Sequence, residues 1–258
     1  EESDWSSDVC SSDLRTRSCR RRDGKIEFGS AHANDAFLAF AFRGTRDNQL
    51  FLTNSVSQKV DHFKPVHDWF RDRLVFVSPD ATFGRMDLFV GDDPARTRGM
   101  DLMLARLDTG IVHLKGESLH RVVTQHRHED GSLTRFELAH ESDGTIRIID
   151  LLPAFLDLAD PATARIYVID ELDRSLHTLL TRRLLEMFLS ASGPDTRGQL
   201  LFTTHDALLM DQSLLRRDEM WVTERNDRGE STLMSFSEYK DVRYDKDIRK
   251  SYLQGRLG

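Results

Sequence analysis

The chain has 258 residues, of which 39% are apolar and 31% are charged, a mixture typical of a folded globular protein and too apolar for a disordered one. Thirty-six basic and 43 acidic side chains give a net charge of −7, which argues against a globally basic nucleic-acid-binding protein. The longest apolar stretches, 37–42 and 146–158, are short or interrupted by charged residues, so the sequence predicts no membrane-spanning segment.

Residues 1–23 differ in composition from everything that follows. The triplet Ser-Ser-Asp recurs in this segment, a basic run covers 15–22, and the two cysteines of the chain, Cys10 and Cys19, both lie here. The composition predicts a disordered or non-native leader, with a basic nucleic-acid-binding arm as the alternative. Because no apolar signal-peptide core accompanies the cysteines, we expect a reducing, cytoplasmic setting.

The next segment carries short apolar runs of strand length. Residues 37–42 and 49–54 lie on either side of the polar segment 43–48, which predicts a hairpin. Residues 73–78 predict another strand, which ends at a proline.

Further along, residues 95–107 show helical spacing of apolar residues and predict a helix. Residues 122–128 and 133–138 predict a second hairpin, because the Asp130-Gly131 pair between them accepts the positive φ angles of a tight turn. We therefore expect a strand-rich N-terminal lobe with a helical insert.

The C-terminal half alternates between helical and strand patterns. The predicted elements are, in order, a helix over 145–159, a strand over 165–169, a helix over 176–191 and strands over 199–203, 220–224 and 232–236. Such alternation predicts an α/β fold with a mostly parallel sheet, whose functional residues lie at the carboxyl ends of the strands.

Two adjacent carboxylates, Asp170 and Glu171, follow the apolar strand over 165–169. In nucleotide hydrolases the first such acid holds Mg²⁺, usually through water, and the second orients and deprotonates the attacking water. The alternative is a buried strand that ends in a solvated acidic loop.

His205 follows the next predicted strand after the polar residues Thr203 and Thr204. If the two strands are neighbours in the sheet, His205 and Glu171 face the same crevice, where an imidazole can hydrogen-bond a γ-phosphate. The alternative is a histidine with a structural role only.

Ser142 precedes the predicted helix over 145–159 and is of a preferred N-cap type. The amides at a helix start, together with the helix dipole, form a natural anion site. Simple capping is the alternative, and the two strand ends downstream favour contact with phosphate.

In this order, the Ser-Asp-Gly helix start, the strand ending in Asp-Glu and the strand ending in Thr-His-Asp resemble the second half of an ABC-type ATPase head. The chain is most similar to the bacterial AAA-family ATP-binding proteins related to the overcoming-lysogenisation-defect and chromosome-maintenance ATPases. The resemblance extends from Ala36 to the C-terminus and is most specific over 141–206. It implies a head of the P-loop NTPase type.

The resemblance also implies roles for individual residues. Asp170 and Glu171 match the Walker B motif, as metal ligand and catalytic base. Asp173 matches the nucleotide-binding D-loop, and His205 matches the switch histidine.

Ser142 and Gly144 match the signature motif, which in this family contacts the γ-phosphate of ATP bound mainly by the other subunit. The implied species is therefore a homodimer that sandwiches nucleotides. Gln58, in a polar loop after an apolar stretch, matches the nucleotide-binding Q-loop glutamine; a solvated glutamine is the alternative.

The Walker A loop needs Gly-x-x-x-x-Gly-Lys-Ser/Thr, and the chain contains no such run. Its one Gly-Lys pair, Gly24-Lys25, has Cys19 where the first glycine should be and Ile26 where the hydroxyl should be. We therefore expect an N-terminally truncated ATPase domain over 24–258 that binds and hydrolyses ATP poorly by itself.

Within this domain we expect a helical insert region over about 60–120 and a lobe over 121–258 that carries the signature, Walker B and switch-histidine segments. The expected cofactors are ATP and Mg²⁺. An effector protein or DNA is a further expected partner, in phage defence or another DNA-linked process, and no membrane is expected.

Two other functions remain open. A metal-dependent nuclease or phosphohydrolase would use the acidic and histidine side chains of the strand ends to hold divalent ions; these are Asp170, Glu171, Asp173, His205 and Asp206. A non-catalytic, ATP-gated scaffold would leave the chemistry to an effector. His126 and His128 alternate on a predicted strand and are interpreted as surface residues, because no cysteine accompanies them as a metal ligand.

Overall fold

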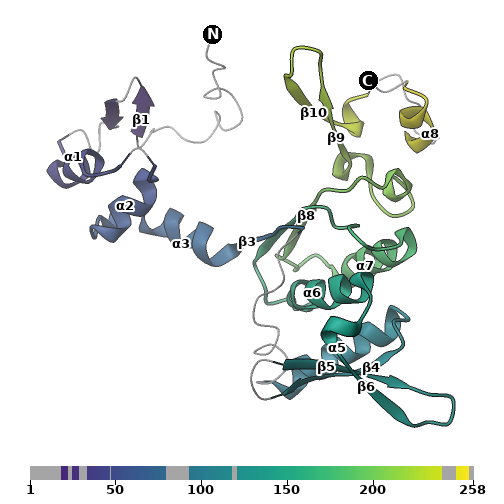
Figure 1. The fold of residues 1–258 in the computed structure, drawn as a ribbon. Helices are drawn as coiled ribbons and strands as arrows, with labels where there is room; N and C mark the ends of the chain where they lie inside the picture. The colour runs from purple at the N-terminus through teal and green to yellow at the C-terminus, as the bar shows by residue number, and fades with distance from the viewer. Residues whose placement is uncertain are drawn as a thin grey trace. The chain divides into compact units, whose positions relative to one another are not determined.

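The computed structural model describes residues 19–22, 25–28, 34–46, 48–79, 93–117, 121–239 and 248–255. The chain divides into two compact units, Glu1–Arg73 and Leu74–Gly258, whose ribbons are drawn in Figure 1. Residues 1–18 and 23 of the predicted leader lie outside the described residues. The segment Cys19–Arg22 forms strand β1, which pairs antiparallel with β2 (Lys25–Phe28), so the predicted boundary after residue 23 falls within a hairpin.

The described part of the first unit is mainly helical after this hairpin. It contains α1 (Ala36–Arg43), α2 (Phe51–Ser57), the 3₁₀ turn η1 (Asp61–Phe63) and α3 (Lys64–Arg73). The predicted hairpin over 37–42 and 49–54 is therefore wrong, and so is the strand-rich lobe expected for this part of the chain.

The physical reason is a helix start that the apolar run conceals. The side chain of Asp35 accepts hydrogen bonds from the amides of Phe37 and Leu38 and caps α1. Leu38 and Ala41, three residues apart, are buried on one face of the helix. A continuous apolar run has neither a period of two nor a clear helical period, so its length alone favoured a strand.

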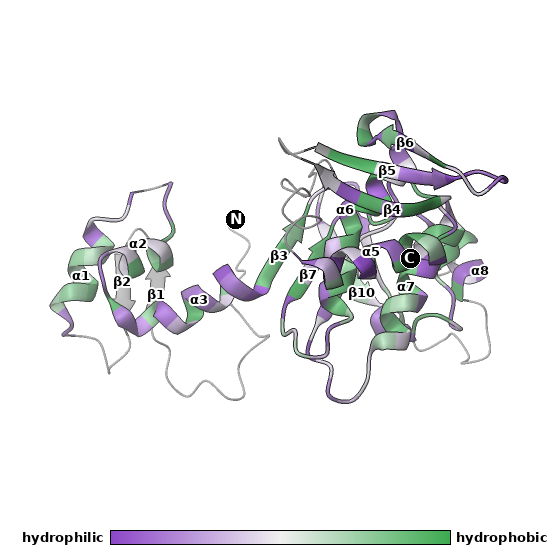
Figure 2. Ribbon diagram, turned by 90° about the horizontal axis from the view of Figure 1, so that it is seen from below, coloured by the Kyte–Doolittle hydropathy of each residue, from purple (hydrophilic) through white to green (hydrophobic). Residues whose placement is uncertain are grey.

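A three-stranded parallel sheet lies at the centre of the second unit. Its order is β3 (Leu74–Val77), β7 (Ile166–Ile169), β8 (Gln199–Phe202), and β3 is hydrophobic along its length (Figure 2). The helices α6 (Asp143–Leu158) and α7 (Thr178–Ala191) pack with the sheet in one apolar core. These elements confirm the predicted α/β alternation and its parallel strands.

Helix α6 is buried without interruption from Arg147 to Phe155, as expected for a helix that is apolar around most of its circumference. It is the central helix of the core, and its first turn supplies the predicted Ser-Asp-Gly segment. The residues at the start of α6, 142–146, are exposed or half-buried and lead directly into this buried stretch.

A second, antiparallel sheet packs beside this core. Its order is β4 (Ile111–Glu117), β5 (Arg121–Arg127), β6 (Leu133–Glu137), followed by the 3₁₀ turn η2 (Leu138–His140). The turn between β5 and β6 is polar (Figure 2) and has Gly131 at a φ of 82°, as the Asp-Gly pair predicts. Helix α5 (Pro94–Arg106) packs against β4 and α6 and confirms the predicted helix, whereas β4 was not predicted.

The last described elements form a small separate cluster. They are the 3₁₀ turns η4 (Arg217–Glu219) and η5 (Phe236–Glu238), the antiparallel strands β9 (Trp221–Arg225) and β10 (Ser231–Ser235), and α8 (Ile248–Leu253). Met220, Val222, Phe236 and Ile248 form its apolar centre. The 3₁₀ turn η3 (Ala207–Leu209), which precedes this cluster, packs into the main core through Leu209. Among the described residues, no helix is both long and apolar enough to span a bilayer.

Candidate functional site

The register of the parallel sheet brings two strand ends together. Ile169 of β7 pairs with Phe202 of β8, so the residues that follow them, Asp170 and Thr203, are neighbours at the carboxyl edge. This edge is where open α/β sheets place their ligand-binding residues. The local structure there follows from the sequence of the two strands, each of which ends in polar residues.

The hydroxyl of Thr203 joins the two strand ends. It donates a hydrogen bond to Oδ1 of Asp170 at 2.5 Å and accepts one from the amide of Glu171 at 2.8 Å. The amide of Leu172 donates to the carbonyl oxygen of Thr203 at 3.0 Å. The Asp-Glu pair is therefore fixed by the neighbouring strand. No local sequence pattern predicts this role of Thr203, because the contact depends on the register of the sheet.

Glu171 and His205 face one another across this edge. Nε2 of His205 lies 3.5 Å from Oε1 of Glu171, and Nη1 of Arg174 lies 3.7 Å from Oε2 of the same carboxylate. The side chain of His205 is 85% exposed. Its packing therefore contributes little to the stability of the fold, and the imidazole is accessible to a ligand. The predicted convergence of the two strand ends is present in the structure.

Glu171 begins a tight turn. Its φ is 46°, in the left-handed region that non-glycine residues rarely adopt, and its carbonyl oxygen accepts a hydrogen bond from the amide of Arg174 at 3.0 Å. Asp173 lies within this turn, with Oδ1 buried and without a hydrogen-bond partner among the described residues. Such non-glycine strain is concentrated at functional sites.

The start of α6 lies against the same turn. The hydroxyl of Ser142 accepts a hydrogen bond from the amide of Thr145 at 3.2 Å and caps the helix. A Cβ atom on Gly144 would lie 2.8 Å from the carbonyl oxygen of Ser175, which is closer than real Cβ contacts. Gly144 is therefore required by the close approach of the turn 170–175, and the structure brings Ser142 and Gly144 to the edge that carries Glu171.

Arg147, one turn into α6, also contacts the carboxylate turn. Its Nη2 lies 3.4 Å from the carbonyl oxygen of Asp170 and 3.3 Å from that of Glu171. Burial lowers the pKa of Arg147, whereas the negative charge of Asp150 raises it. In the sequence, Arg147 stands out only as a charged residue that interrupts an apolar stretch, and this interruption is the signal by which it could have been found.

The arrangement does not favour the nuclease alternative. The carboxylate of Asp206 is used in hydrogen bonds within the fold: it accepts one from the hydroxyl of Thr178 and one from the amide of Leu208 at 2.9 Å. Among the described residues, no three histidine, cysteine, aspartate or glutamate side chains are grouped to hold a metal ion. His126 pairs with Glu141 at 2.7 Å, and the Nε2 of His128 lies within hydrogen-bond distance of Thr134.

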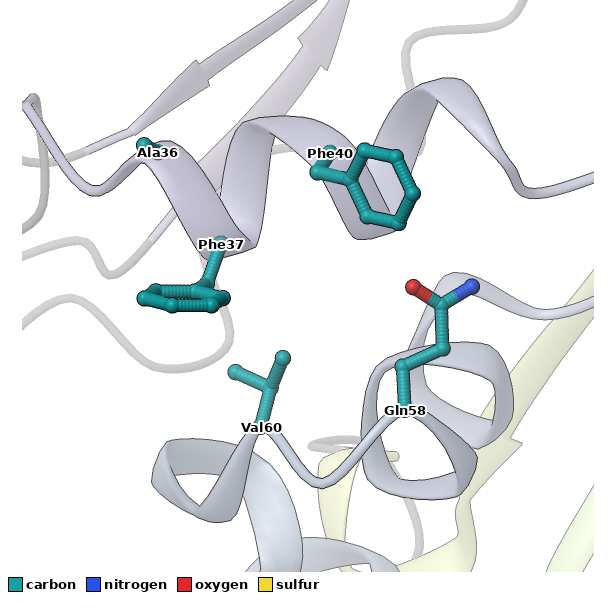
Figure 3. A pocket seen from close by; sticks show the side chains of 5 residues that line it. All are labelled: Ala36, Phe37, Phe40, Gln58 and Val60. Atoms are coloured by element: carbon teal, nitrogen blue, oxygen red, sulfur yellow. The ribbon is translucent and has the colours of Figure 1, made fainter.

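Gln58 belongs to the first unit. Its side chain donates a 3.4 Å hydrogen bond to Asn54 and lines an apolar groove with Phe37, Phe40 and Val60 (Figure 3). These contacts explain its position after α2 by packing. Its correspondence to a Q-loop glutamine stays a prediction.

Lys25 does not occupy a phosphate-binding loop. It is the first residue of β2, whereas a Gly-rich phosphate loop leads from a strand into a helix. The residues that fit a nucleotide are those at the carboxyl edge of the parallel sheet. Asp170 there presents a carboxylate whose orientation is fixed by Thr203, and a carboxylate of this kind suits Mg²⁺ bound largely through water.

The chain resembles known proteins at the level of a family model and of solved structures. A family model described as "AAA domain, putative AbiEii toxin, Type IV TA system" matches residues 16–211, which include all the candidate site residues. Among solved structures, the chain is similar to the SMC head domain from Thermotoga maritima, with 15% identity and a TM-score of 0.39 over 62% of this chain and 52% of that chain. The chain thus spans about half the length of that head domain. No curated protein matches it.

Proposed function

Because the chain belongs to the family of AAA domains described as "AAA domain, putative AbiEii toxin, Type IV TA system", we propose that it forms part of a Mg²⁺-dependent ATPase whose hydrolytic residues are those of the 170–171 strand end. The observation that carries the proposal is the 3.5 Å approach of His205 to Glu171 beside Asp170. A carboxylate pair and an imidazole at the carboxyl edge of a parallel sheet are suited to phosphoryl chemistry.

Each residue has a distinct task in this proposal. Asp170 would hold Mg²⁺ through water, and a bound ion would supply positive charge next to the phosphates. Glu171 orients the attacking water and takes its proton. His205, exposed and within reach of Glu171, donates a hydrogen bond to the γ-phosphate of ATP and so detects its presence.

The proposal includes a second copy of the chain. Ser142 and Gly144 lie at the N-terminus of α6, where amides and the helix dipole attract an anion. We assign these amides to the γ-phosphate of ATP bound mainly by the other copy, so the active form is a homodimer. Asp173, in the turn next to Gly144, and Gln58 are assigned to nucleotide binding by their correspondence to family motifs.

The test compares ATP turnover by the parent, by Glu171→Gln and by Glu186→Gln. Glu186 is an exposed residue of α7 that pairs with Arg182 at 2.8 Å and serves as the matched control. Since a general base contributes roughly 10²–10⁴ in rate, we expect Glu171→Gln to lose turnover by that factor and to keep MgATP binding.

The measurements use the longest reading frame that encodes this chain as well as the chain itself. The chain has no Gly-x-x-x-x-Gly-Lys-Ser/Thr run, so we expect weaker nucleotide binding from it alone. Parental turnover in Glu171→Gln, with Glu186→Gln unchanged, would show that the assigned base is wrong.

A further inference from the structure

Arg147 is a buried cation that donates hydrogen bonds to backbone carbonyl oxygens and lies near the negative charges of Asp150 and Glu171. The residue is 5% exposed, and its Nη2 lies between the carbonyl oxygens of Asp170 and Glu171, at 3.4 and 3.3 Å. A buried charge is costly unless polar groups compensate it. Here the compensation comes from the two carbonyl oxygens of the turn and from the negative charges of Asp150 and Glu171.

The other two nitrogens of the guanidinium, Nε and Nη1, do not contribute hydrogen bonds, since both are buried and have no partner among the described residues. An apolar side chain of similar volume would fill this space without leaving buried donors unsatisfied. Core packing therefore does not account for an arginine here, whereas the charge of Asp150 and the hydrogen bonds to the turn both favour one.

The turn that Arg147 contacts needs support from its surroundings. Glu171 and Ser175 have φ angles of 46° and 59°, and such strained backbone persists only where neighbours hold it. Thr203 binds the turn from β8, and Gly144 admits the carbonyl oxygen of Ser175 from the side of α6. Arg147 adds a charged contact from the same helix, one turn beyond Gly144.

We infer that Arg147 is a positioning residue that holds the Glu171 turn against the start of α6, so that movement of this helix is transmitted to the carboxylate. The role in hydrolysis rests on the proposed function. The structural contact does not, because it involves only groups within this chain. Arg147 thereby links two parts of the proposed machinery within one chain. One is the N-terminus of α6, which we assign to the ATP of the second copy, and the other is the carboxylate of Glu171, which orients the attacking water.

The first test is amide hydrogen exchange without nucleotide, on the parent, Arg147→Met, Arg147→Lys and the control Arg216→Met. Arg216 is exposed and pairs with Asp218 and Glu219 at the surface. In Arg147→Met we expect exchange in the segment 171–176 to rise at least about tenfold, since a hydrogen bond to a charged group is lost. We expect the β5–β6 hairpin to be unchanged in every variant, and Arg147→Lys to lie between the parent and Arg147→Met.

The second test is ATP turnover by the same variants. We expect kcat to fall about tenfold or more in Arg147→Met with KM within about twofold, because a misplaced base affects the transition state more than substrate binding. A purely structural role would raise exchange throughout the second unit and would not separate kcat from KM.

The outcomes separate the two proposals. Unchanged exchange over 171–176 in Arg147→Met overturns the positioning role, whatever the turnover. A parent that does not hydrolyse ATP, with exchange altered as expected, contradicts the proposed function and leaves the contact intact. If Arg147→Met does not fold, as judged by circular dichroism, Arg147→Lys decides: parental exchange over 171–176 contradicts the inference and faster exchange there supports it.

Discussion

Thr203 is the residue through which one strand end fixes the other. Its hydroxyl donates to Asp170 and accepts from the amide of Glu171, although the side chain is exposed. Thr203→Val removes both hydrogen bonds, and water replaces part of them at this exposed position. We therefore expect the variant to lower the free energy of unfolding by about 1 kcal/mol, within the usual range for hydrogen bonds. Urea denaturation with an unchanged m-value measures this.

Thr203→Ser is the matched control, since it keeps the hydroxyl and removes only a methyl group. We expect it to retain most of the stability that valine loses. Equal stability of the valine variant and the parent would mean that the hydroxyl does not hold the carboxylate pair.

The residues of the site differ in how far the sequence predicts them. Glu171 and His205 were predicted to converge because each follows an apolar run of strand length, and parallel neighbours end at one edge. Thr203 and Arg147 were not predicted to take part. Their contacts depend on strand register and on the packing of α6, neither of which leaves a local pattern.

At the scale of elements, Tyr167 joins β7 to α6. Its hydroxyl donates to Oδ2 of Asp157 at 2.9 Å, and the same oxygen accepts from the hydroxyl of Thr163 at 3.0 Å. Burial, together with the adjacent Asp157 carboxylate, raises the pKa of Tyr167 from 10.0 to about 12. The strand that carries the carboxylate pair is thus anchored to the central helix at its other end.

This anchor makes stability depend on alkaline pH. Between about pH 10 and 12 the native state keeps the phenolic proton that the unfolded state has lost, so the free energy of unfolding falls as the pH rises through that window. Below pH 10 both states are protonated and the contribution is constant. We expect the parent to lose stability relative to Tyr167→Phe above pH 10, by up to about 1.4 kcal/mol per pH unit.

Urea denaturation of both proteins at several values between pH 9 and pH 11 provides the measurement. Tyr167→Phe is the reference for the parent, because the variant lacks the titrating hydroxyl and keeps the aromatic ring. Parallel curves for the two proteins above pH 10 would contradict the raised pKa.

The helices and strands differ in how clearly the pattern of their apolar residues predicts them. The β5–β6 hairpin was predicted from the Asp-Gly pair between its two strands, and α6 and α7 from the helical pattern of their apolar residues. Helix α1 was predicted as a strand because its run of Phe, Leu and Ala has no polar face, and only the cap Asp35 marks its start. Tertiary burial decided the structure there.

At the scale of the whole molecule, electrostatic repulsion between the net negative charges of two copies opposes their association. Each chain carries a net charge of −7, and bound nucleotide adds more negative charge, so two copies repel one another at low ionic strength. Under the proposed function, the attraction comes from the N-terminus of α6, which meets the partner's γ-phosphate. Under the same proposal, a negative charge introduced at position 142 weakens dimer formation.

Ser142 also caps α6, and the experiment has to separate this role from contact with phosphate. Asparagine and aspartate are both as good N-cap residues as serine, so Ser142→Asn and Ser142→Asp keep the helix start and differ in one negative charge. In a Glu171→Gln background with MgATP, we expect Ser142→Asp to weaken dimer formation at least about tenfold. A like-charge contact near a protein surface costs roughly 1–4 kcal/mol, and twofold symmetry provides two such contacts in each dimer.

Sedimentation velocity of the encoded full reading frame, with and without MgATP, measures the association. Ser142→Asn is the control and is expected to dimerise within about threefold of its background, because it restores the cap without the charge. Equal ATP-dependent dimerisation of the asparagine and aspartate variants would mean that no phosphate approaches Ser142, and the N-terminus of α6 would then be a helix start only. Loss of dimerisation in both variants would point instead to a specific need for the serine hydroxyl, and it would contradict an attraction that rests on charge.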